Sequence, residues 1–460
     1  MLMNRRDFIQ ASSFAAFHFS LRRQRKEFDV HRFGAVGDGT TDDTAAVQRA
    51  IDAATACGGK VILRGGSKYL CGAVILKDHV EFHLADDATI LAHTEKSMYP
   101  PKGPGVISSN GAIDVKITGT GIIDGQGQKF VSSYSETDER WEPKGFRTRM
   151  FSLHEVKDLE VSGIRIQNAP FWGLHMLGCE RVLVDGITIR NWLDMPNCDG
   201  IDPDHCRDVE IRNCDIVCAD DAICVKTTLQ EKDYGPSHNI YVHDCVVTSR
   251  DSGLKVGTEN YMDISKVKFE RCKVLSGGRG PTITHRQPGN ISDILFDDIE
   301  VKAEHHAARW WGWGEPISLT AWPREKDAHI GSLRNVTLRN IRASAENSVH
   351  IDGQPDQPLE NLLLENVNVT IDTWTKYPGG KLDNRPIVAG VEGLEPHATN
   401  AFTLRNVRNV TMRRCSAQWG NMRKDYYGAA LEAIHVEGLK LEEFHGEAAF
   451  PDRQKAIVIR

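Results

Sequence analysis

Short segments of alternating apolar and polar residues recur along this 460-residue chain, and they share one seven-residue form. A polar residue comes first, then two apolar positions separated by one residue, then two polar or small residues and a small apolar one. The series begins at Asp158 (DLEVSGI) and extends to Asn409 (NVTMRRC). Alternation with period two predicts a short β-strand rather than a helix.

The spacing of these units predicts how the strands assemble. Successive units begin 23, 27, 31, 27, 27, 42, 26 and 48 residues apart. Periods in the twenties are typical of stacked units, none of which can bury its apolar side alone. We therefore predict an all-β parallel solenoid. The two long steps predict inserted loops, which in solenoids usually lie on one face and often bind ligands.

The cysteines follow the same register. Cys214, Cys245, Cys272 and Cys415 occupy the seventh position of the unit, where other repeats have isoleucine or valine. Free cysteine packs as a small hydrophobe, so we expect these side chains to be buried and stacked. No Cys-x-x-Cys spacing suggests zinc. A disulfide among Cys198, Cys206, Cys218 and Cys224 remains open at this stage.

The residues that precede the repeat predict an export signal followed by a cap. Residues 1–26 contain paired arginines, a modest apolar stretch and a basic run, which predicts a twin-arginine export signal with a linker; a disordered basic tail is the alternative. We assign residues 27–460 to a single β-helix domain and expect export to the periplasm or medium. A Gly/Asp turn and an Ala-rich amphipathic helix within Phe28–Leu70 predict a short helix capping the solenoid.

Charge and hydropathy exclude some partners. The net charge of −7 argues against a broad nucleic-acid surface, and no stretch approaches the ~20 apolar residues of a membrane span. We expect a monomer without cofactor or metal.

The candidate chemistry lies between Pro196 and Thr227. This segment has Asp199 and the pair Asp220–Asp221, only 21 residues apart, which is close to one repeat. Residues one repeat apart stack on neighbouring coils, so three carboxylates should converge. One should then have a raised pKa and act as general acid, while the others activate water, at a carboxyl separation of about 6.5–9.5 Å for inversion. The alternative for any single Asp is a turn residue that caps its own backbone.

Two motifs at this point resemble a known family. The segment from Phe33, FGAVGDGTTDDTAAVQRAI, is similar to the cap of the pectate-lyase-like β-helix superfamily, and NCDGID followed by ADDAICVKT resembles the NTDG and DD motifs of glycoside hydrolase family 28, the polygalacturonases. The resemblance implies a right-handed parallel β-helix and hydrolysis of a pectic polysaccharide or oligosaccharide with inversion. It implies Asp220 as the acid and Asp199 with Asp221 as the base pair. Asn197 and Asp202 are candidate substrate-binding residues.

Two other motifs of that family are altered here. Ser252 stands where the GHG motif has histidine, and Thr282-Ile283-Thr284 stands where RIK has its cations. A buried uronate without a cationic partner is strongly disfavoured, so either the cation comes from elsewhere or the sugar beside the cleaved bond is neutral, such as rhamnose. The candidates for a replacement subsite, with Ser252, are Lys226, Lys255, His285 and Arg286. We expect a modified or branched pectic substrate, such as a rhamnogalacturonan fragment, attacked from a chain end.

A tryptophan-rich loop lies in the 42-residue step, with Trp310, Trp311, Trp313 and Trp322. Aromatic faces on loops stack on sugars, which makes Trp313 a candidate for substrate binding; a plug holding the loop on the solenoid is equally consistent. Two other functions also stay open. A polysaccharide lyase or uronate epimerase would hold calcium with several carboxylates, and a non-catalytic solenoid would only bind glycans.

Overall fold

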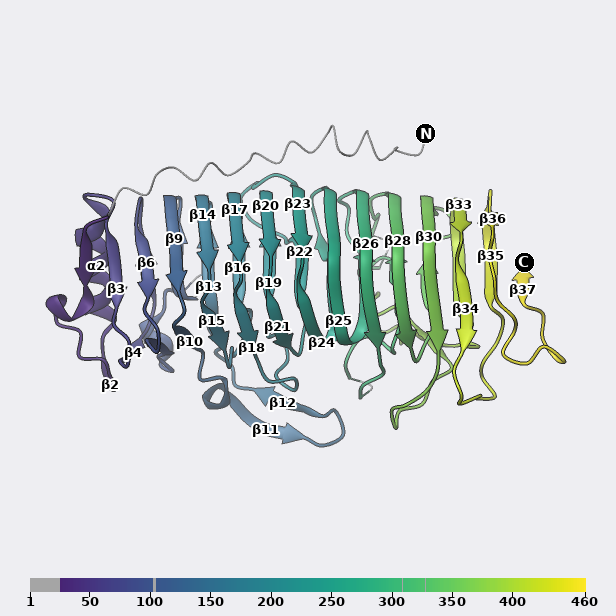
Figure 1. Ribbon diagram of the computed structural model, residues 1–460, viewed down its shortest axis with the longest axis horizontal. Coiled ribbons are helices and arrows are strands. Elements are labelled where there is room, and N and C mark those ends of the chain that lie inside the picture. The colour runs from purple at the N-terminus through teal and green to yellow at the C-terminus, as the bar shows by residue number, and fades with distance from the viewer. Residues whose placement is uncertain (1–24, 102–104, 308, 327) are drawn as a thin grey trace.

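The computed structural model describes residues 25–101, 105–307, 309–326 and 328–460. The chain forms a parallel β-helix whose coils follow one another along the horizontal axis of Figure 1, from α2 (Thr44–Thr55) at one end to β37 (Ile457–Ile459) at the other. Each coil passes through three parallel sheets in a fixed order and then returns to the first. The predicted all-β solenoid is confirmed.

The strands of each sheet are bonded to those of the neighbouring coils. The first sheet contains β5 (Val74–Leu76), β8 (Gly105–Asn110), β13 (Arg149–His154), β16 (Leu174–Leu177), β19 (Ile201–Asp204), β22 (Ile223–Thr227), β27 (Ser318–Ala321), β29 (Val349–Asp352) and β37. The second contains β1 (Glu27–Asp29), β3 (Lys60–Leu63), β6 (Glu81–Leu84), β9 (Ile113–Gly119), β14 (Lys157–Ser162), β17 (Glu180–Asp185), β20 (Arg207–Arg212), β23 (Ser237–His243) and β36 (Lys440–Glu442). The third contains β2 (Asp38–Asp42), β4 (Lys68–Cys71), β7 (Thr89–Ala92), β10 (Ile122–Asp124), β15 (Arg165–Gln167), β18 (Thr188–Arg190), β21 (Asp215–Cys218) and β34 (Ser416–Trp419).

In the C-terminal half, long strands bend through the corners and belong to more than one sheet. They are β24 (Val246–Asn260), β25 (Ile264–His285), β26 (Ile291–Ala303), β28 (Leu333–Ala345), β30 (Leu359–Ile371), β33 (Phe402–Arg413) and β35 (Leu431–Glu437).

The seventh positions of the repeat line the interior in register. Cys272 pairs with Ile299, and Ile299 with Ile341, on neighbouring coils. Cys245 and Cys272 are 0% and 1% exposed, as expected for stacked core residues. Each of the eleven cysteines is a free thiol, so the disulfide considered within 198–224 does not form. The predicted register is confirmed.

The backbone conformation explains why the first position of each unit is a polar residue. Asn335, Asn361 and Asn409 all have φ of 57–59°, in the left-handed region that Asn tolerates better than most residues. Their amides also stack: Asn361 Nδ2 donates to Asn335 Oδ1 at 3.0 Å, and Asn409 Nδ2 to Asn361 Oδ1 at 3.2 Å. A ladder of side-chain amides therefore marks the corner where these three coils enter the second sheet.

The predicted cap is present at the N-terminal end. Helix α2 buries Val47, Ala50 and Ile51 against the first coils, and Asp43 precedes it. The carboxylate of Asp43 accepts from the backbone N–H groups of Val36 and Gly37, so it fixes the Gly/Asp turn rather than the helix amides. A 3-10 helix (Val30–Phe33) adjoins the cap, and two others lie at Lys96–Met98 and Gly127–Phe130. Within the described residues, no helix has both the length and the apolar character that a membrane span requires.

Three insertions leave the solenoid at the turns between the third and first sheets. Residues 125–148 contain an antiparallel hairpin of β11 (Val131–Ser135) and β12 (Arg140–Pro143), which projects from the lower edge of the solenoid in Figure 1. Residues 304–317 contain Trp310, Trp311 and Trp313, whereas Trp322 follows β27 and therefore lies outside this loop. Residues 372–401 contain a second antiparallel pair, β31 (Lys381–Asp383) and β32 (Leu394–Pro396). The loops therefore gather along one edge of the coil stack.

Candidate active site

The three candidate carboxylates lie at this same edge, in consecutive third-to-first turns. Asp199 comes two residues before β19 and Asp221 two residues before β22, and the two strands are in register. One carboxylate oxygen each from Asp199, Asp220 and Asp221 lies within 4.8 Å of the other two. The stacking expected from the repeat spacing is present. These nearest oxygens are closer together than about 6.5–9.5 Å, but that range refers to whole carboxyl groups and stays a prediction.

Two buried lysines each pair with one of the carboxylates. Lys226 Nζ donates to Asp199 Oδ2 at 2.8 Å and lies 3.2 Å from Asp202 Oδ1. Lys255 Nζ donates to Asp221 Oδ2 at 2.8 Å. These lysines project from β22 and β24, in the first sheet. The sequence placed both in a subsite for the substrate carboxylate, but the ammonium groups instead bind carboxylates of the protein.

Asp220 is the carboxylate without a lysine partner. Its oxygens accept from the backbone N–H groups of Asn197 and Asp221, at 3.1 and 3.0 Å. Burial, followed by the neighbouring negative charges of Asp199, Asp221 and Asp251, raises the pKa of Asp220 well above that of an ordinary aspartate. The raised pKa favours a protonated group that can act as an acid.

The base candidates each keep one oxygen unused. Asp199 and Asp221 are 2% and 3% exposed, and each accepts the lysine through Oδ2. Among the described residues, the Oδ1 atom of either carboxylate has no hydrogen-bond partner. Buried carboxylate oxygens normally have partners, so two unpaired acceptors at one place indicate where a hydrogen-bonding group is received. Burial raises the pKa of Asp199, and the Lys226 charge opposes that rise.

A fourth carboxylate occupies the altered GHG position. Asp251 is buried and accepts a 2.8 Å hydrogen bond from Ser252 Oγ. Burial raises the pKa of Asp251 to about 6, although the charge of Lys255 opposes the shift. Ser252 is itself buried, with its hydroxyl directed to Asp251. The sequence named Ser252 as a candidate but did not identify Asp251.

His285 and Arg286 lie further along the solenoid and are fully buried. The guanidinium of Arg286 directs five donor contacts at the oxygens of Pro386, His285, Thr320 and Asn384, which matches the five N–H groups of an arginine. His285 Nε2 contacts the carbonyl of Gly289 at 2.9 Å, and burial lowers its pKa to about 4. Arg286 therefore has no donor left for a substrate, and both residues fasten loops to the solenoid.

Trp313 is also part of the scaffold. Its ring is 4% exposed and stacks on His305, with centroids 4.1 Å apart. Trp310 is 5% exposed and has the Arg250 guanidinium 5.8 Å from its ring. The interpretation of these tryptophans as a plug is the one that the structure supports; an exposed sugar platform at Trp313 is wrong.

Sequence reasoning missed two arginines on the other side of the carboxylates. Arg147 donates to Asn197 Oδ1 at 2.9 Å and lies over the ring of Phe171. Arg149 begins β13, two strands before β19, and its guanidinium lies 4.9 Å from the ring of Trp172. Among the described residues, neither arginine has a carboxylate within ion-pair distance. Burial lowers the pKa of both, and Asp199 opposes that shift.

A bridge of side-chain contacts joins two of the insertions at this edge. The tip of the hairpin carries Glu139, whose carboxylate accepts from Lys376 Nζ at 2.7 Å and from Tyr377 Oη at 2.6 Å. Arg250 donates to the carbonyl of Glu139 at 3.1 Å. The insertions at 125–148 and 372–401 therefore meet above the turns that lie between them.

Asp199, Asp220 and Asp221 are close enough together to hold a metal ion. A divalent cation would gain from three negative charges, but two of them are already bound by ammonium groups at 2.8 Å. A cation at this place would be repelled by both lysines. The arrangement is therefore a poor fit for the calcium that the lyase or epimerase alternative needs.

Comparisons with known proteins agree with this geometry. The sequence model of glycosyl hydrolases family 28 matches residues 66–378, more than half of the chain. The chain belongs to this family. It is therefore a glycosidase, and its altered GHG and RIK positions are departures within the family.

Relatives and solved structures extend the match. The chain is 27% identical over 390 residues to a probable polygalacturonase of Vitis vinifera, covering 78% of this chain and 77% of that one. It is 29% identical over 280 residues to an exopolygalacturonase of Zea mays, covering 54% and 67%. The family 28 exopolygalacturonase of Yersinia enterocolitica superposes with a TM-score of 0.68 at 17% identity, over 91% of this chain and 79% of that one. This likeness confirms the right-handed parallel β-helix.

Proposed function

We propose that this protein hydrolyses a pectic polysaccharide or oligosaccharide from a chain end, with inversion at the anomeric carbon. The observation that carries the proposal is that three adjacent carboxylates have different pKa values and different partners. Asp220 has a raised pKa and no cationic partner, whereas Asp199 and Asp221 each accept a lysine through one oxygen. Hydrolysis of a glycosidic bond requires one acid and one base, and these carboxylates offer one acid and two candidate bases.

The proposed chemistry follows from these protonation states. Asp220 donates its proton to the glycosidic oxygen as the bond to the anomeric carbon breaks. The unpaired Oδ1 atoms of Asp199 and Asp221 accept hydrogen bonds from one water, which attacks the anomeric carbon from the opposite face. One of these carboxylates takes the proton that the water loses. Lys226 and Lys255 hold the two bases in place.

The closeness of the nearest carboxylate oxygens, within 4.8 Å of one another, supports a second candidate. Separations of about 5–5.5 Å are typical of retaining glycosidases, in which one carboxylate attacks the sugar directly. The unpaired oxygens of two bases favour a shared water instead, and hence inversion. NMR of the anomeric centre of the first product decides between them: inversion gives initially the opposite anomer, and retention the same anomer as the substrate.

The acid assignment has its own test. Asp220→Asn should lower turnover by about 10²–10⁴-fold, because an amide cannot donate the proton. Its thermal unfolding should match that of the wild type. Asp215→Asn, an exposed aspartate on the same coil, is the control and should remain active. Near-normal activity of Asp220→Asn, or a product that absorbs as an unsaturated uronate, would exclude the proposed mechanism.

We propose that the substrate is a uronate and that Arg147 and Arg149 bind its carboxylate. The support is their position beside Asn197 and Trp172, together with the relatives named polygalacturonase. Thr282 and Thr284 cannot pair with a carboxylate, so the cations would lie on the opposite side of the cleavage site from RIK. A neutral sugar next to the threonines, as in a rhamnogalacturonan fragment, remains compatible with this arrangement.

We also propose that the protein is exported and acts outside the cytoplasm as a monomer. Support comes from the arginine pair and apolar stretch of residues 1–26, most of which lie outside the described residues. A reporter fused after residue 26 should leave the cytoplasm. Replacing Arg5 and Arg6 by lysine should keep the reporter in the cytoplasm.

A further inference from the structure

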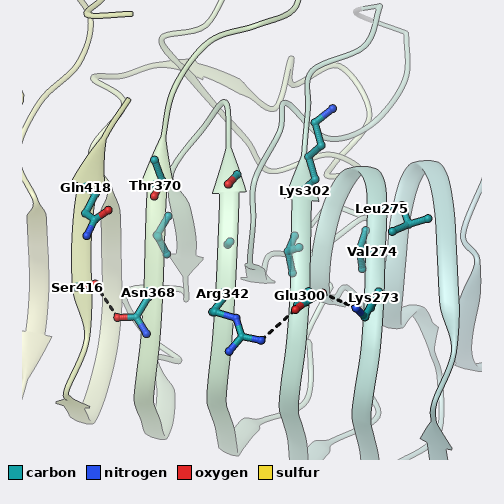
Figure 2. Close-up of a pocket in the computed structure, with 14 residues that line it drawn as sticks. Lys273, Val274, Leu275, Glu300, Lys302, Arg342, Asn368, Thr370, Ser416 and Gln418 are labelled. Carbon is teal, nitrogen blue, oxygen red and sulfur yellow. Dashed lines mark hydrogen bonds and ion pairs between the residues drawn. The ribbon is translucent and has the colours of Figure 1, made fainter. Parts of the chain in front are cut away.

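The outer face of the third sheet has a groove of about 520 Å³ that shares no residue with the carboxylate site. It crosses five neighbouring strands, β25, β26, β28, β30 and β34, and Figure 2 shows its side chains standing in line across them. Its long direction follows the stacking of the coils. A linear polymer could lie there with each unit facing a new strand.

Two rows of side chains border the groove, and each row follows the strand register. One row consists of Lys273, Glu300, Arg342, Asn368 and Ser416. The other continues from Lys302 through Ser344 and Thr370 to Gln418. Most of these side chains are hydroxyls, amides or cations, the groups that bind sugar hydroxyls and carboxylates.

The charges of the first row leave an excess of positive charge. Glu300 is bound by Lys273 at 2.9 Å and by Arg342 at 3.0 Å, so one carboxylate is shared by two cations. The cationic side chains are 54% and 68% exposed, which leaves N–H donors facing solvent. The whole chain, in contrast, has a net charge of −7. A locally positive groove on a negative protein favours an anionic ligand.

An aromatic ring adjoins the second row. The Lys302 ammonium lies 5.2 Å from the centre of the Trp374 ring, and Trp374 is 39% exposed. Trp374 Nε1 donates to Glu304 Oε2 at 2.8 Å, which fixes the orientation of the ring. Partly exposed tryptophans of fixed orientation offer a face for a sugar ring. Neighbouring strands are about 4.8 Å apart, a step comparable to the length of one pyranose unit.

We propose that this groove is a second binding site for an acidic polysaccharide chain, separate from the site of cleavage. The inference rests on the proposed action on uronate polymers. It predicts that the groove holds the enzyme on the polymer while chain ends enter the closed site. The ligand is a uronate chain several sugars long, because a short oligosaccharide can occupy the active site without reaching the groove.

The test compares two double variants that each remove two exposed, ion-paired cations. Lys273→Ala with Arg342→Ala removes the two cations of the first row and leaves Glu300 without them. Arg408→Ala with Arg413→Ala removes two similarly paired arginines from β33, where it belongs to the second sheet. Both are assayed on polygalacturonate and on trigalacturonate. Both are also placed in the Asp220→Asn background for affinity electrophoresis in gels containing polygalacturonate or fully methyl-esterified pectin.

The groove variant should lose about 5-fold or more of its kcat/KM on the polymer and keep its rate on the trimer. It should also lose retardation in polygalacturonate gels, and salt should reduce the wild-type retardation, because exposed charges are screened. Asn368→Asp, which keeps the side-chain shape and adds a negative charge, should act in the same direction. The matched double variant should behave like the wild type.

The proposal is overturned if the groove and control variants bind polygalacturonate equally, or if neutral esterified pectin retards the protein as strongly. A loss of rate on trimer and polymer alike would also overturn it, since that is a fault in the active site. Failure of the proposed function would give a different result from failure of the groove proposal. In that case the wild type cleaves neither substrate, while binding in the gels still reports on the groove.

Discussion

Lys226 lies between two buried carboxylates, Asp199 and Asp202, and its charge lowers the pKa of Asp199 against the effect of burial. Lys226→Met should therefore raise the pKa of Asp199. Because the base acts only when ionised, the acidic limb of the kcat/KM profile should move to higher pH. The alkaline limb, set by loss of the Asp220 proton, should stay in place.

The measurement is the pH profile of kcat/KM, with Lys232→Met as control, because Lys232 is an exposed lysine paired with Glu155. Removing one partner of a buried ion pair costs about 3–5 kcal/mol, so thermal unfolding must show that the variant is folded at the assay temperature. An acidic limb that does not move would show that Asp199 is not the titrating base.

Arg149 is the residue on which uronate recognition depends in the proposed function. A charge-assisted hydrogen bond contributes about 1.5–3 kcal/mol, so Arg149→Ala should lower kcat/KM on a galacturonate substrate by about 10-fold or more. Arg149→Lys should recover only part of the lost kcat/KM, because lysine lacks the planar guanidinium that binds a carboxylate through two hydrogen bonds. Arg165→Ala, at an exposed site on the third sheet, is the control. Equal losses on uronate and neutral substrates would show that Arg149 only supports the fold.

The sequence located the three aspartates but not their surroundings. Asp199 and Asp221 could be found because they lie one repeat apart within a motif. Arg149 lies 50 residues before Asp199, in no motif, and only the register of β13, β16 and β19 brings it near. Lys226 and Lys255 were identified, but whether they face the substrate or the aspartates depends on side-chain geometry that the spacing does not contain.

At the scale of the elements, the asparagines of the amide ladder both adopt a left-handed backbone conformation and link neighbouring coils by hydrogen bonds. Asn361 has φ of 57°, a region in which β-branched residues are genuine outliers. Asn361→Val should destabilise the protein by about 1–2 kcal/mol from backbone strain alone, with a further loss from two ladder hydrogen bonds. Asn361→Gly removes the same amide without the strain and should cost less. Chemical denaturation measures both, and equal losses would assign the whole effect to the ladder.

Alternation and spacing predicted the second-sheet strands closely, because those strands are half-buried and repeat in every coil. They did not predict the long strands such as β25, which bends through three sheets. They also did not predict the hairpin of β11 and β12, since it packs on loops rather than on the repeat. Its position depends on contacts such as that of Glu139 with Tyr377, 238 residues apart in the chain.

At the scale of the whole molecule, insertions that leave the chain before and after the aspartate turns contact one another through Glu139. Glu139 accepts hydrogen bonds from Lys376 and Tyr377, and we expect this bridge to admit a chain end to the active site but not the middle of a polymer. Two solved structures to which the fold compares well, from Yersinia enterocolitica and Thermotoga maritima, are named exopolygalacturonases. The likeness shows the fold alone, so chain-end attack rests on the bridge.

Replacing residues 132–142 by two glycines should remove the bridge and open this end of the active site. The short connection is feasible because Val131 and Pro143 already pair at the base of the hairpin. Wild-type protein should release short products of one size from polygalacturonate, with little early loss of viscosity. The opened variant should release oligomers of many sizes and lower the viscosity sooner at equal numbers of new reducing ends. Glu139→Ala removes the two side-chain contacts but keeps the hairpin, so it should shift the products less. Random cleavage by the wild type, or unchanged products after removal of the hairpin, would show that the bridge does not select chain ends.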